Sequence, residues 1–112
     1  MTLDALRAYG ANTAEGVARC MNNEPFYLRM IAMALADKNF DALTAAMDAG
    51  DVAAAFEAAH ALKGSIGNVS LTPIYRPLCE LTELLRGKSM PAEGGRALLE
   101  QIVSEREKAL RL

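Results

Sequence analysis

The sequence predicts an all-α fold, and three observations support that prediction. Hydrophobic residues make up 52% of the 112-residue chain, and alanine and leucine, both strong helix formers, dominate among them. Aromatic residues are few, and no run of β-branched residues suggests a strand. Apolar side chains recur at helical spacing, as at Ile74, Leu78, Leu81 and Leu85. The length fits one domain, so we expect residues 1–112 to form a single helical bundle.

Capping residues and breakers divide the chain into seven expected helices. Thr2, Asn23 and Asp51 are suited to N-cap three of them, because each side chain can accept from a free backbone N–H. Gly10 ends the first of these helices and Gly50 ends the fourth expected helix, since glycine adopts the left-handed C-cap conformation easily. The short connections predict that neighbouring helices pack antiparallel. The expected helices span about 3–10, 13–21, 24–38, 40–50, 52–69, 72–87 and 91–112, and the longest loop candidate is "GKSMPAEGG" at 87–95.

Charge and composition exclude several classes of function. The net charge is -2, with both signs mixed along the chain, so no basic stripe predicts binding to nucleic acid. The first ten residues, "MTLDALRAYG", lack the pattern of a signal peptide. No apolar run approaches the roughly 18 residues of a membrane span. We therefore expect a cytoplasmic monomer that does not contact a membrane, with Cys20 and Cys79 as reduced thiols.

The stretch "AHALKGSIGN" at 59–68 contains the single histidine of the chain, His60, and two glycines within an expected helix. Each interior glycine costs about 1 kcal/mol relative to alanine. On a helical wheel His60 lies about 130° from the centre of the apolar side. Lys63, Gly64 and Gly67 lie beside it, so the surface next to the imidazole is nearly bare. The apolar side comprises Val52, Phe56, Ala59, Leu62, Ile66 and Val69.

This arrangement predicts that a sizeable, negatively charged group approaches His60 closely and meets the ammonium of Lys63. Simpler explanations exist for each residue alone. A solitary surface histidine ordinarily has no special role, and helical glycines can serve close packing or, at Gly67, mark a fraying end. The combination of all four residues at this spacing is what favours a functional site.

The segment "HALKGSIG" at 60–67 resembles the core motif of the histidine-containing phosphotransfer (HPt) family of two-component phosphorelays. That motif is roughly His-x-Leu-Lys-Gly-Ser/Ala followed by small residues. The preceding "DAGDVAAAFEAAH" at 48–60 also looks like the family's approach to its histidine. The resemblance implies a small antiparallel four-helix bundle with additional short N-terminal helices.

The same resemblance implies a function for the site. His60 would accept a phosphoryl group from a receiver-domain aspartate and pass it to another receiver, while Lys63 balances the charge and Gly64 and Gly67 give access. The expected partners are response-regulator receiver domains, with a hybrid histidine kinase as a further candidate. The chain would be a carrier without its own kinase site, and we assign it no metal and no cofactor.

Three positions depart from the family pattern. Ser70 stands where glycine is frequent, Thr82 stands where a longer polar residue is common, and Pro77 lies inside an expected helix. These departures leave the choice of partner open.

Arg86 is a candidate second cation for the phosphoryl group. It is expected to share a polar face of its helix with Tyr75, Cys79 and Thr82. A solvated surface arginine is the alternative interpretation.

Two other functions compete with the phosphorelay. A nucleophilic Cys–His pair would need Cys20 or Cys79 beside His60, and no local motif supports it. The chain also has no nucleotide-binding loop, so it is not a kinase. A helical interaction module whose histidine is never phosphorylated is the stronger competitor, and acid-labile phosphate on His60 would distinguish the two.

Overall fold

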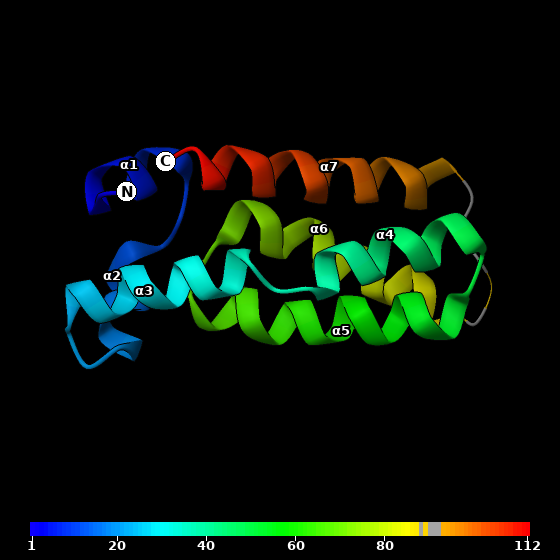
Figure 1. Cartoon of the computed structure of the whole chain (residues 1–112), viewed down its shortest axis with the longest axis horizontal. Helices are drawn as coiled ribbons and strands as arrows, with labels where there is room; N and C mark the ends of the chain where they lie inside the picture. Colours follow the sequence, from blue (N-terminus) through cyan, green and yellow to red (C-terminus); the bar gives the residue numbers. More distant parts are fainter. Residues whose placement is uncertain (88, 90–92) are drawn as a thin grey trace.

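The structure is a computed structural model, and it describes residues 1–87, 89 and 93–112. Over these residues the chain forms helices and no strand, within an elongated body of 41 × 21 × 19 Å (Figure 1). The all-α prediction is therefore confirmed. The helices are α1 (Leu3–Tyr9), α2 (Thr13–Arg19), α3 (Glu24–Leu35), α4 (Asn39–Ala49), α5 (Val52–Asn68), α6 (Thr72–Arg86) and α7 (Glu93–Leu110).

The body of the protein is a four-helix bundle in which one position is shared by two helices. Helices α3 and α4 lie one after the other along the same side of α5 (Figure 1). Helices α5, α6 and α7 then pack in chain order as antiparallel neighbours. The predicted architecture, an antiparallel four-helix bundle preceded by short helices, is what the structure shows. No helix of the described ranges combines the length and apolar character that a membrane crossing requires.

Apolar side chains from every long helix meet along the axis of the bundle. Leu62 and Ile66 of α5 and Leu78 and Leu81 of α6 are fully buried. Burying each such side chain contributes about 1.5 to 3 kcal/mol relative to leaving it in water. This packing fixes the rotation of α5 about its own axis, and so fixes which of its residues face solvent.

Most helix ends fall where the capping residues predict. Thr2, Asn23 and Asp51 each accept a backbone N–H of the following turn. Gly10 and Gly50 end their helices with φ of +114° and +71°, a conformation that side chains rarely adopt.

Two expected boundaries were wrong. Helix α3 ends at Leu35 instead of 38, because the Asp37 carboxylate accepts the Asn39 N–H and starts the next helix. The loop candidate at 87–95 overlaps α7, which already includes residues 93–95. Residues 88 and 90–92, and with them the expected helix start near 91, lie outside the described residues.

The two short N-terminal helices pack at the end of the bundle where α5 finishes and α6 begins. The Tyr9 hydroxyl donates to the Glu105 carbonyl of α7 at 2.9 Å, which places both chain termini at this end (Figure 1). Tyr27 of α3 is fully buried there, and its hydroxyl donates to the Val69 carbonyl at 2.8 Å. Burial, with Cys20 and Glu15 nearby, raises the pKa of Tyr27 to about 12. Tyr27 therefore donates this hydrogen bond as a neutral phenol at neutral pH.

Gly16 of α2 makes room for the Tyr27 ring. A Cβ added at Gly16 would lie 2.3 Å from the Tyr27 Cε1 atom. The ring cannot move away without losing its hydrogen bond to Val69, so this helical glycine is required by close packing.

Gly16→Ala is therefore expected to lower the free energy of unfolding by about 1 to 3 kcal/mol, the usual cost of overpacking a core. Alanine is the better helix former, so propensity alone predicts the opposite sign. Gly64→Ala in α5 is the matched control, because a Cβ there would meet nothing within 4 Å. Urea unfolding of both variants measures the difference. Equal gains in stability at the two positions would contradict the packing of Tyr27 against α2.

Candidate functional site

Helix α5 presents His60 to solvent at its middle, as the helical wheel predicts. The side chains of Ala55, Ala59, Leu62 and Ile66 are fully buried on the opposite side. Small alanines on that side let α5 pack closely against its neighbours. His60 is exposed, and it makes no hydrogen bond or ion pair within the described part of the chain. The imidazole is thus free to meet a group that arrives from outside.

The imidazole of His60 stacks on the Phe56 ring one turn earlier in α5. The ring centroids lie 5.9 Å apart and the ring planes differ by 18°, a geometry within the range of favourable aromatic pairs. Phe56, which the helical wheel places on the apolar side of α5, is partly buried and packs against the core at the edge of this helix. The i, i+4 spacing of Phe56 and His60 was the signal that could have revealed the pair.

The Arg86 side chain contacts the Phe56 ring and makes no hydrogen bond to His60. Its guanidinium lies over the Phe56 ring, 5.2 Å from the centroid, and pairs with Glu83 at 3.3 Å. Arg86 is thus close to the imidazole only through Phe56, and the structure does not place it as a second cation on His60.

The expected polar face of α6 was also wrong at one position. Thr82 is fully buried, and its hydroxyl donates to the Leu78 carbonyl at 2.6 Å. This bond within the helix satisfies the only polar group that Thr82 brings into the core.

Lys63 and Gly64 lie one turn beyond His60, about 5 Å further along the helix axis. Lys63 is partly buried and has no ion pair within the described residues. A Cβ added at Gly64 would enter open space. The structure therefore brings together the imidazole, an ammonium group and a stretch of bare backbone.

Gly67 differs from Gly64 in its surroundings. A Cβ at Gly67 would lie 2.9 Å from Cε1 of Tyr75, a residue of α6 whose ring packs against this glycine. The surface at Gly64 is open, whereas Gly67 makes room for an aromatic ring of the protein itself, and the access expected from both glycines stays a prediction.

Hollows lie one turn to either side of His60. Toward the start of α5, an apolar hollow is lined by Val52, Phe56, Leu85 and Arg86, among others. Toward the end of α5 lies a hollow of about 290 Å³ that we call the polar hollow. Its walls are made by α2, α5 and α6. They include Asn12, Glu15, Arg19, Lys63, Gly64 and Tyr75.

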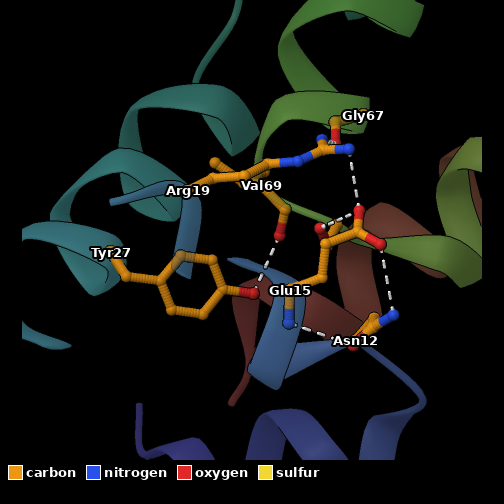
Figure 2. Close-up of polar contacts among 7 residues, drawn as sticks. Asn12, Glu15, Arg19, Tyr27, Gly67 and Val69 are labelled. Carbon is orange, nitrogen blue, oxygen red and sulfur yellow. Dashed lines mark hydrogen bonds and ion pairs between the residues drawn. The ribbon is translucent and has the colours of Figure 1, made fainter. Parts of the chain in front are cut away.

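Helix α2 is fastened to the end of α5 by a polar network (Figure 2). Arg19 donates to the Gly67 carbonyl at 2.7 Å and pairs with Glu15 at 2.9 Å. Glu15 in turn accepts from the Ser70 hydroxyl at 3.0 Å and from the Asn12 amide at 3.4 Å. The Gly67 carbonyl, which lies in the last turn of α5 and also accepts the Ser70 N–H, thus finds a second donor in α2. This network was not predicted, although the i, i+3 and i+4 spacing of Asn12, Glu15 and Arg19 places them on one helix edge.

The network also explains one departure from the family pattern. Ser70 has φ of +57°, the left-handed region that favours glycine. A non-glycine residue there costs about 1 kcal/mol or more. Glu15 holds the Ser70 hydroxyl in place, and the Asn12 N–H donates to the Ser70 carbonyl at 3.0 Å.

Chemically, the site offers an exposed imidazole nitrogen that can act as a nucleophile toward an incoming group. Within the described residues, no three of the His, Cys, Asp and Glu side chains gather as a metal site would require. Cys20 is buried, and Cys79 is partly buried beside Leu84 and Leu98. The exposed imidazole, with Lys63 beside it, is suited to attack a group that a partner protein brings.

A helical bundle that carries an exposed histidine on its surface, flanked by a cation and bare backbone, has the arrangement expected of a group-carrier protein. A family model described as Hpt domain matches residues 28–109, and the chain belongs to this family. The comparisons with curated proteins and with solved structures found no match. Hpt domains are histidine phosphotransfer carriers of two-component phosphorelays, they are not kinases, and they interact with receiver domains. Residues 1–27, with α1 and α2, lie outside the match.

Proposed function

We propose that His60 is the phosphoacceptor of a phosphorelay, taking the group from a receiver-domain aspartate and passing it to a second receiver. The observation that carries the proposal is the position of this single histidine. It is exposed at the middle of α5, one turn from open backbone at Gly64, in a chain that belongs to the Hpt family.

In the forward step, the lone pair of the neutral imidazole Nε2 attacks phosphorus. A P–N bond forms while the P–O bond to the aspartate breaks, and the carboxylate leaves with the electron pair. The reverse step on a second receiver regenerates the imidazole. Such transfer depends mainly on positioning and electrostatics. The chain supplies the position through α5, and the Phe56 ring restricts where the imidazole can lie.

Lys63 supplies the charge in this proposal. An ammonium group one turn from the phosphorylated ring can meet the phosphoryl oxygens by a charge-assisted hydrogen bond. Lys63 is available for this role because no acidic side chain within the described residues holds it.

Lys63→Ala is therefore expected to disfavour the phosphorylated state by about 1 to 2 kcal/mol, the lower part of the range for a hydrogen bond to a charged group because Lys63 is only partly buried. Transfer should slow or its equilibrium should shift toward the receiver, without being eliminated. Lys63→Arg is the control, because it keeps the charge. Time courses of label transfer with an acetyl-phosphate-charged receiver measure both effects. A rate and an equilibrium that match the parent would assign Lys63 no part in the reaction.

The competing function is a helical interaction module that binds a signalling partner without being phosphorylated. The hollows beside His60 suit either function, since both need a docked partner. The test is to incubate the protein with receivers charged by acetyl phosphate and to assay for phosphate that is stable in alkali and lost in acid. We expect such phosphate on the chain. Stable binding of a receiver with no phosphate transferred would favour the interaction module.

A further inference from the structure

We infer that α2 is part of the docking surface for the receiver, and that it selects receivers offering a carboxylate or carbonyl-rich segment to the polar hollow. This inference rests on the proposed function, because the occupant of the hollow is the receiver that docks over His60. The residues concerned are Asn12, Glu15 and Arg19, which the family match does not cover.

The polar hollow is continuous with the surface around His60. Lys63 and Gly64 line it, and the same two residues lie one turn from the imidazole. A receiver domain that contacts the bare backbone at Gly64 therefore also covers this hollow. Its far wall is the edge of α2 that carries Glu15 and Arg19. With a volume of about 290 Å³ and an opening to solvent, the hollow has room for a partner side chain.

The hydrogen-bonding groups of the hollow determine what fits it. The carboxylate of Glu15 is already engaged by Arg19, Ser70 and Asn12. Arg19 has five N–H groups, of which one donates to the Gly67 carbonyl and one pairs with Glu15, so three remain within the described structure. Lys63 adds three more donors. Donors thus outnumber free acceptors, and the complementary partner is rich in acceptors.

The net charge of the hollow also favours a partner that carries a carboxylate. Arg19 and Glu15 neutralise each other, and Lys63 leaves an excess of one positive charge. Half of the Arg19 side-chain surface is still exposed, at 50%, so a partner carboxylate can reach its guanidinium. Charged groups at the rim of an interface mainly set the association rate and the choice of partner.

The test compares Arg19→Gln with Glu15→Gln. Each variant removes the same ion pair, whose loss costs about 0.2 to 1 kcal/mol at a partly exposed site, so both should fold. Their effects on the charge of the hollow are opposite. His60 is first phosphorylated directly with phosphoramidate, a small donor that needs no docking, and the rate of label transfer to a set of receiver domains from the same organism is then measured.

Phosphoramidate loading should be the same in the parent and in both variants. For receivers that the parent serves well, we expect Arg19→Gln to slow transfer roughly three- to tenfold and Glu15→Gln to speed it, with both effects shrinking at high salt. Slower transfer in both variants would show that α2 only supports the fold, and unchanged transfer in both would place α2 outside the interface. Either result overturns the inference while leaving the proposed function intact. Failure of the parent itself to be loaded at His60 overturns the proposed function and this inference together.

Discussion

His60→Gln is expected to abolish phosphorylation of the chain by an acetyl-phosphate-charged receiver. The glutamine amide lacks a nucleophilic lone pair, and the sequence contains no second histidine to substitute for it. The fold should survive, because His60 is exposed at the middle of α5 and glutamine is a good helix former. The free energy of unfolding should change by no more than about 0.5 kcal/mol, as for most surface substitutions.

Two measurements on this variant are needed together. Circular dichroism during urea unfolding reports the stability, and autoradiography after incubation with the labelled receiver reports the transfer. Label that persists on a folded His60→Gln protein would show that the acceptor lies elsewhere.

Gly64→Gln is expected to raise the stability of the fold while slowing phosphoryl transfer from a receiver. The added side chain meets nothing within the protein, so helix propensity should raise the free energy of unfolding by up to about 1 kcal/mol. The same side chain would stand one turn from His60, on its face of α5, and displace a docking receiver. A displacement of about 1 Å can cost roughly a hundredfold in rate, so we expect transfer from a receiver to fall roughly ten- to a hundredfold.

Gly64→Ala gives the graded control, with a similar gain in stability and an intermediate loss of transfer. Phosphoramidate loading should stay normal in both variants, because a small donor needs no docking surface. Normal receiver transfer by Gly64→Gln would contradict the need for bare backbone beside His60. Lower stability of both variants would instead make Gly64 a packing residue.

Three glycines in the interiors of α2 and α5 show how much of the structure could be predicted from the sequence. Gly16, Gly64 and Gly67 all occupy helix interiors, where propensity alone disfavours them. Only the packed structure distinguishes the open space at Gly64 from the Tyr75 ring at Gly67 and the buried Tyr27 ring at Gly16. These rings come from other helices, so local sequence patterns carry no information about where they lie.

The helices and the exposed histidine could be predicted because they depend on local signals. Caps such as Asp51 and the apolar spacing of α5 fix the helix and the side that His60 faces. The wheel places Phe56 on the apolar side of α5, but it cannot show that the ring lies at the edge of the helix, where it stacks on His60 and where Arg86 of α6 lies over it. The network of Glu15 and Arg19 depends on how α2 meets the end of α5, more than forty residues later.

Nuclear magnetic resonance of the ¹⁵N-labelled imidazole tests the phosphoacceptor assignment most directly. Because the chain has a single histidine, one set of ring signals reports on His60 without further assignment. After incubation with an acetyl-phosphate-charged receiver, we predict a phosphorus–nitrogen coupling at Nε2 that disappears when the sample is acidified. A protein that carries phosphate while its ring signals stay those of the free imidazole would contradict the assignment of His60 as the phosphoacceptor.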